Sequence, residues 1–152
     1  GARSADEVIK HSRGSCSSKH LLLYELFTDL GHTTEHLMGK TDLRETLRVL
    51  LPDFRAPAPI VDFHNFLRVE VAGRTFLVDA TFGLREARAG LPTNLPWAAD
   101  RDCSPLFRVS DYAQVDDPLA AKLKALETLS DAQRDERRRA LDLIVSTLGS
   151  ST

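Results

Sequence analysis

The sequence has few of the residues that mark specialised classes of protein. Its 152 residues include only 2 cysteines, and aromatic side chains make up 7% of them. Two cysteines in contrasting contexts do not form a disulfide framework, which favours a reducing compartment, so we expect a cytoplasmic protein. Apolar runs extend over only a few residues and no secretory signal segment is recognisable, so we expect no membrane association.

The sequence also lacks an excess of charge of one sign, because it has 20 Lys and Arg residues and 22 Asp and Glu residues. This balance excludes bulk binding of nucleic acid. Apolar residues make up 42% of the chain, and its length is sufficient for a core without metal or disulfide cross-links. We expect one domain over residues 1–152, with a core at about 12–83, an irregular loop at 84–115 and helices at about 117–148.

A helix is predicted from Ser15, a plausible N-cap, to about Leu30, with Gly31 as the stop signal. The spacing i, i+7, i+11 and i+14 puts four side chains on one face of this helix: Cys16, Leu23, Phe27 and Leu30. The cysteine therefore opens the side of the helix that faces the core. A strand over 32–39, ending at Gly39, and a helical or loop segment over 41–51 follow.

A β-hairpin is the clearest predicted motif, because two apolar-rich runs flank Ala72-Gly73 after a proline-marked loop at 52–59. In this register Val71 pairs with Arg74, which places His64 and Asp79 on one face as diagonal neighbours. A shift of one residue would separate them. The opposite, core-facing side is expected to carry Phe63, Leu67, Val69, Val71, Phe76 and Val78.

Two C-terminal helices are predicted from their caps. Asp117 and Pro118 provide an N-cap and a first-turn proline, and Ser130 with Gln133 has capping-box spacing. The expected apolar stripes are Leu119, Leu123 and Leu126 on the first helix and Leu141, Ile144, Val145 and Leu148 on the second, which Gly149 stops. The arginine run at 137–139 is expected to form a solvated helix face.

Cys16, His64 and Asp79 are the parts of a thiol-based acyl-transfer site. A helix N-terminus favours the thiolate of Cys16 and supplies N–H groups for an oxyanion. His64 would move the thiol proton, and Asp79 would orient the imidazole. Gly14 and Ser15 precede the nucleophile and are expected to contact substrate, as is Asn65 beside the base.

The combination resembles the transglutaminase-like superfamily, which has a papain-like cysteine fold. The resemblance lies in Gly14-Ser15-Cys16, Leu30-Gly31, His64-Asn65-Phe66 and Val78-Asp79-Ala80-Thr81. It implies an α+β fold in which a Cys-bearing helix packs on an antiparallel sheet, here with a C-terminal helical hairpin. It also implies a Cys16, His64 and Asp79 triad and acyl transfer through a thioester, without cofactor or metal. Asn65-Phe66 departs from the Ala-Trp that is frequent in the family, and no second oxyanion donor can be assigned.

The acyl acceptor stays open in this interpretation. Water would make the protein a cysteine peptidase or amidase, and an amine would make it a transglutaminase-like enzyme, with a peptide, protein or small amide as substrate. Residues 77–83 also resemble the aspartate motif of arylamine N-acetyltransferases, which use the same triad with acyl-CoA. That family is longer and usually has Arg-Gly-Gly where this chain has Arg13-Gly14-Ser15. A third alternative is a non-catalytic binding module, with a protein partner on the helices at 117–148.

Other candidate residues are assigned weaker roles. His32 to His36 fit the inverted zincin pattern H-x-x-E-H, but Gly31 and two threonines favour a strand or turn, so no metal site is expected. His20 lies on nearly the face of Cys16 and could favour the thiolate, although no carboxylate partner is visible. Trp97, in the long loop, could line a substrate groove. Cys103 is given no role.

Overall fold

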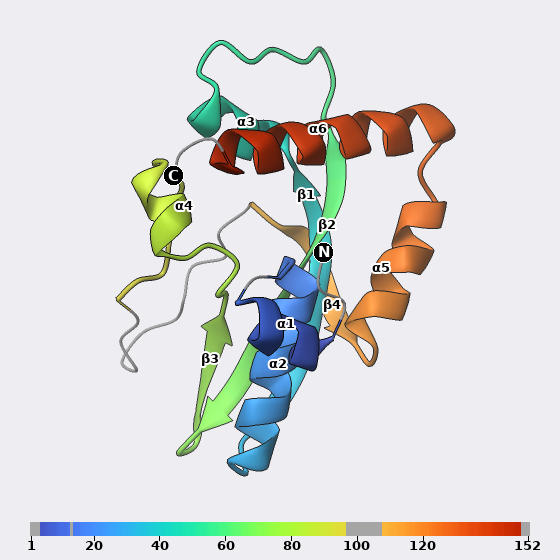
Figure 1. The fold of residues 1–152 in the computed structure, drawn as a ribbon. Helices are drawn as coiled ribbons and strands as arrows, with labels where there is room; N and C mark the ends of the chain where they lie inside the picture. The colour runs from blue at the N-terminus through green and yellow to red at the C-terminus, as the bar shows by residue number, and fades with distance from the viewer. Residues whose placement is uncertain (1–3, 13, 97–107, 150–152) are drawn as a thin grey trace.

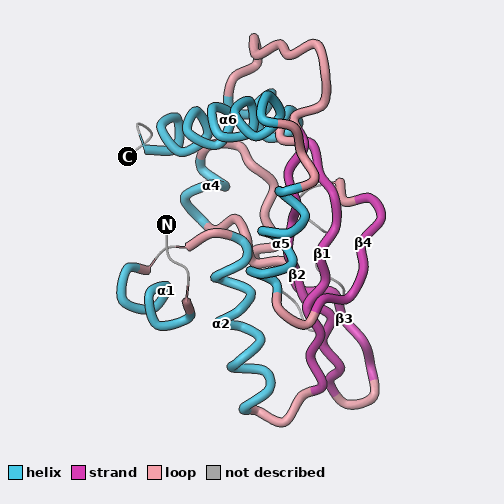
Figure 2. The backbone as a smooth tube through the Cα atoms, turned by 90° about the vertical axis from the view of Figure 1, so that its right-hand side faces the viewer, coloured by secondary structure: helices cyan, strands magenta, loops and turns pink. Residues whose placement is uncertain are grey.

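The structure is a computed structural model that describes residues 4–12, 14–96 and 108–149. Four strands form one antiparallel sheet in the order β3-β2-β1-β4. Helix α2 lies against one face of the sheet, α1 packs on α2 on the side away from the sheet, and α6 crosses one end of the sheet (Figures 1 and 2). The elements are α1 (Ala5–His11), α2 (Cys16–Asp29), β1 (Thr33–Asp42), α3 (Arg44–Leu50), β2 (Val61–Val71), β3 (Arg74–Val78), α4 (Leu84–Arg88), β4 (Ser110–Val115), α5 (Pro118–Glu127) and α6 (Asp131–Gly149). The expected α+β class, with a cysteine-bearing helix on an antiparallel sheet, is confirmed. The expected C-terminal helical hairpin is wrong, because α5 packs on β1, β2 and α2 whereas α6 packs on α3 and β2 (Figure 1).

The predicted start of the cysteine helix is confirmed. Ser15 is extended and its Oγ accepts the N–H of Ser18 at 3.3 Å, a cap that stabilises a helix by about 1 kcal/mol. Cys16 is thus the first residue of α2. Leu23 and Phe27 pack on the sheet, against the cluster formed by Leu67, Val69 and Val78. Leu30, expected on the same face, is exposed as the C-cap.

The hairpin register is confirmed, since Val71 pairs with Arg74 and Leu67 with Val78. Ala72 and Gly73 both have positive φ, at 51° and 75°, which is the geometry of the type I′ turn that suits two-residue hairpins. The turn therefore sets the position of every side chain along β2 and β3. Phe63 is only half-buried at the far end of the predicted core face.

Residues 84–115 are not one irregular loop, which corrects the prediction. A short helix, α4, begins at Leu84, where Glu86 accepts the N–H of Gly83 at 2.8 Å. The strand β4 pairs with β1 at the edge of the sheet, with a register shift between Met38 and Lys40. Its residues are mostly exposed, so it lacks the apolar alternation by which strands are identified. The strand predicted to end at Gly39 also continues to Asp42.

Both C-terminal helices begin at the predicted caps. Asp117 accepts the N–H groups of Leu119 and Ala120, and Ser130 and Gln133 form the reciprocal capping box. Their apolar stripes were only partly predicted. Leu123 is 65% exposed and Val145 is 68% exposed. Helices α5 and α6 therefore pack on the rest of the protein through other side chains. On α6 the packed side chains are Ala140, Leu141, Ile144 and Leu148, which cover α3 and the loop before β2.

The arginine run is not wholly solvated either. Arg137 is 17% exposed and its Nε donates to Asp62 of β2 at 2.7 Å. Arg138 pairs with Asp135 on the helix surface. No helix in the described part of the chain is long and apolar enough to cross a bilayer.

Candidate active site

Cys16, His64 and Asp79 come from three different elements. Cys16 opens α2, His64 lies in β2 and Asp79 follows β3 directly. His64 and Asp79 are both buried, at 2% and 1% exposure, whereas Cys16 is partly exposed. The structure therefore brings the three predicted residues to one place, with Cys16 as the most exposed of the three residues.

The His64–Asp79 contact is short and buried. His64 Nε2 lies 2.7 Å from Asp79 Oδ2, which is within the range of a charge-assisted hydrogen bond. With Nε2 engaged by the carboxylate, Nδ1 is the ring nitrogen left for the thiol. The predicted placement of both residues on one face of the hairpin is confirmed.

A second set of contacts fixes the Asp79 carboxylate. Its Oδ1 accepts the backbone N–H of Thr81 at 3.1 Å and the Thr81 hydroxyl at 2.7 Å. Asn94 donates to the Asp79 carbonyl at 2.9 Å, and Lys19 donates to the Thr81 carbonyl at 2.6 Å. These bonds hold the segment after β3 in place, so the imidazole partner has one orientation.

The pKa of the Cys16 thiol is lowered and the pKa of the His64 imidazole is raised. Burial raises the pKa of Cys16, but the charge of Lys122 and a hydrogen bond with His64 outweigh it and leave the pKa at about 6. The backbone N–H of Asn65 contributes in the same direction. Burial lowers the pKa of His64, but its hydrogen bonds to Asp79 and Cys16 raise it to about 9. Between these two values the pair is a thiolate and an imidazolium.

Lys122 is a site residue that the sequence analysis missed. It lies on α5, and its Nζ is 3.8 Å from the Cys16 sulfur. The two residues are 106 positions apart, and a lysine on an amphipathic helix carries no signal of such a contact. Only the packing of α5 against α2 and β2 brings it there.

His20 is buried beside the same carboxylate but has a different role. Its Nε2 accepts the N–H of Ala80 at 2.9 Å, and its Nδ1 lies 2.8 Å from the Cys16 carbonyl. The proton is therefore on Nδ1, and the ring is neutral. Burial lowers the pKa of His20 to about 4, although the charge of Asp79 opposes this. The sequence analysis saw no carboxylate near His20, and the structure places Asp79 Oδ1 3.6 Å from His20 Nε2.

The residues predicted to bind substrate fall into two groups. Gly14 and Ser15 directly precede Cys16, and a Cβ at Gly14 would lie 2.6 Å from Ser18 Oγ, so Gly14 is packed against the helix. The Asn65 side chain is fully buried and donates to Ser17 Oγ at 2.6 Å, which links β2 to α2. Trp97 and Cys103 lie outside the described residues.

The inverted zincin pattern does not form a metal site. His32 precedes β1 and His36 lies within it, so the two histidines are not on a helix. Glu35 pairs with Arg68 at 2.8 Å, and His36 stacks on Tyr24. Within residues 4–12, 14–96 and 108–149, no cluster of three potential metal ligands was found.

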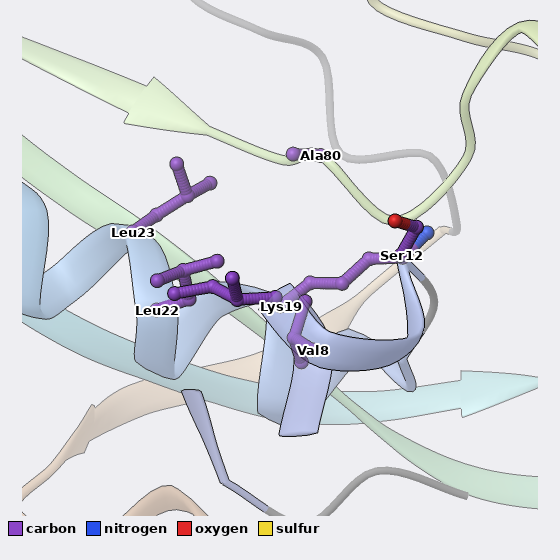
Figure 3. Close-up of a pocket in the computed structure, with 7 residues that line it drawn as sticks. Val8, Ser12, Lys19, Leu22, Leu23 and Ala80 are labelled. Atoms are coloured by element: carbon purple, nitrogen blue, oxygen red, sulfur yellow. The ribbon is translucent and has the colours of Figure 1, made fainter. Parts of the chain in front are cut away.

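Two mainly apolar cavities adjoin the segment that carries Asp79. One, of about 310 Å³, lies between α1, α2 and Ala80, and its lining includes Val8, Ser12, Lys19, Leu22 and Leu23 (Figure 3). The other, of about 290 Å³, is lined by Phe27, Val78, Phe82 and Leu95 among others, with Asp79 at its wall. Both are sized for small apolar groups.

Comparison with known proteins identifies a family for this chain. A family model described as N-acetyltransferase matches residues 2–116, which include Cys16, His64, Asp79 and β4. No curated protein and no solved structure matches the chain. The match supports the resemblance to arylamine N-acetyltransferases and does not support the transglutaminase-like one. Helices α5 and α6 lie after the matched residues.

Proposed function

The chain belongs to the N-acetyltransferase family, and we propose that it transfers an acyl group from an acyl-CoA thioester to the nitrogen of a small amine through a thioester on Cys16. The observation that carries this proposal is the buried 2.7 Å contact between His64 and Asp79 beside a thiol at a helix start. The family supports an amine as acceptor, in preference to the peptidase and transglutaminase-like alternatives.

In the first half of the proposed reaction the Cys16 thiolate attacks the carbonyl carbon of the donor. A carbon–sulfur bond forms, and the carbonyl electron pair moves to oxygen. Collapse breaks the bond to the CoA sulfur, and His64 gives its proton to that leaving thiolate. Asp79 keeps the imidazole in one orientation throughout.

In the second half the amine attacks the Cys16 thioester. His64, now neutral, takes the proton that the amine loses, and Cys16 leaves as the thiolate. The ion pair of the free enzyme is thereby restored. Because the pKa of Cys16 is about 6 and that of His64 about 9, the competent form is populated between these values, and acylation should fall off on both sides of that window.

The test is acylation of the enzyme by acetyl-CoA with no amine present, followed by acid quench and intact mass. We expect one added acetyl group, mapped to Cys16 and removed by an added arylamine or alkylamine. Cys103→Ser should acylate normally, and Cys16→Ser and His64→Ala should not. Absence of the adduct on a folded protein, with acetylation by an activated phenyl ester instead, would favour a hydrolase over the proposed transferase.

A further inference from the structure

Lys122 presents a positive charge to the nucleophile from outside the matched part of the chain. Its Nζ lies 3.8 Å from the Cys16 sulfur, and its side chain is 15% exposed. A cation at this distance from an incipient anion interacts strongly when water is partly excluded. The helix that carries it, α5, begins after the last residue that the family model matches.

Asp62 of β2 fixes the position of Lys122. Its Oδ1 lies 3.5 Å from Lys122 Nζ and accepts the Arg137 Nε–H at 2.7 Å. One carboxylate, 9% exposed, therefore faces two cations from α5 and α6. A single negative charge cannot balance both of them, and an unbalanced charge at a mostly buried position is costly.

The Cys16 thiolate supplies the missing negative charge. In the part of the chain that the structure describes, contacts link Cys16 and His64 to the cations Lys122 and Arg137 and to the anions Asp62 and Asp79, and proton transfer makes Cys16 an anion and His64 a cation. His20 adds no charge, because it accepts the Ala80 N–H in its neutral form. Transfer of the thiol proton to His64 leaves the total charge of the group unchanged, but it gives Lys122 an anion at 3.8 Å and Asp79 a cation at 2.7 Å.

We propose that Lys122 is a fourth catalytic residue, whose ammonium group keeps Cys16 ionised for attack and which Asp62 and Arg137 hold in place. This inference rests on the proposed function of Cys16. In the acylation step the negative charge moves from sulfur to the carbonyl oxygen, and when the thioester has formed Lys122 keeps only Asp62 of its two anionic partners. The C-terminal helices thus complete the site and do more than cover the sheet.

The test is the pH dependence of Cys16 alkylation by iodoacetamide in a Cys103→Ser background. In Lys122→Gln the side chain can still donate to Asp62, but the charge is gone. We expect the midpoint of Cys16 alkylation to rise by about one pH unit. At pH values below the midpoint this corresponds to a tenfold smaller thiolate fraction. Lys122→Arg should keep the wild-type midpoint. Lys124→Gln, an exposed lysine on the same helix, is the matched control and should change nothing.

A second measurement observes Lys122 itself in the protein that keeps this lysine. After reductive ¹³C-methylation of the lysines, the Lys122 signal, assigned by its loss in Lys122→Arg, should shift with the Cys16 midpoint. In Cys16→Ser the Lys122 signal should no longer shift at this pH. A Lys122 signal that ignores the thiol titration, or a Lys122→Gln profile that overlies the wild-type profile, would overturn the proposal. Neither readout uses acetyl-CoA, so failure of acylation alone would reject the proposed function and leave the Lys122 result standing.

Discussion

His20 Nε2 and Asp79 Oδ1 lie 3.6 Å apart, yet each of these atoms accepts hydrogen bonds from another residue. His20 Nε2 accepts the Ala80 N–H, and Asp79 Oδ1 accepts both donors of Thr81. The other carboxylate oxygen is left to His64. Two histidines therefore surround one carboxylate, but only His64 has the contact that stabilises an imidazolium.

This division of roles predicts different effects of substitution at the two histidines. His64→Gln removes the imidazolium that lowers the pKa of Cys16, so the alkylation midpoint should move from about 6 toward the ordinary value of 9.0. His20→Gln should leave the midpoint near that of the wild type, because the neutral ring contributes no charge. The measurement is the rate of iodoacetamide labelling against pH with Cys103→Ser as background. An equal shift in both variants would contradict the assignment of His64 as the base.

His20 should instead affect stability at acid pH. The pKa of His20 is about 4 in the folded protein, against 6.5 for an ordinary histidine. Between these two pH values the unfolded chain therefore binds more protons than the folded protein. The free energy of unfolding should therefore fall as the pH falls from 6.5 to 4. His20→Gln should reduce that loss by on the order of 2 kcal/mol.

Urea unfolding at about pH 4.5 and about pH 7.5 measures this contribution as a difference between wild type and variant. The comparison cancels the part due to other histidines, such as His36, whose pKa is also lowered by burial. Parallel pH slopes in the two proteins would show that His20 is not held neutral in the fold.

Gly14 should be intolerant of a side chain because α1 packs closely over it. A Cβ would lie 2.6 Å from Ser18 Oγ and 2.8 Å from Val8 Cγ2, so the helices would have to separate. We expect Gly14→Ala to destabilise the protein by about 1–3 kcal/mol. Gly149→Ala, where nothing lies within 4 Å, is the control. Equal unfolding free energies for the two variants would rule out the close approach.

The hairpin and the cysteine helix could be predicted because local chemistry determines them. Ala72-Gly73 sets the register, and this register brings His64 to Asp79. The strand β4 could not be predicted, since an exposed edge strand needs no apolar alternation. The place of Lys122 and the bonding partners of His20 were also beyond sequence reasoning. The first depends on how α5 packs, and the second are backbone groups at Cys16 and Ala80, which any residues provide.

The turn that sets this register is not optimal in sequence. Ala72 has a φ of 51°, a conformation that costs an ordinary L-residue roughly 1 kcal/mol and that asparagine adopts more readily. Ala72→Asn would create the Asn-Gly pair that type I′ turns favour. We expect the free energy of unfolding to increase by about 0.5–1 kcal/mol, with an unchanged slope against urea. Because the turn positions β3 and so Asp79, the Cys16 alkylation midpoint should stay the same. A destabilised Ala72→Asn variant would contradict the type I′ assignment of the turn, and a raised midpoint in that variant would mean that the substitution had displaced Asp79 from His64.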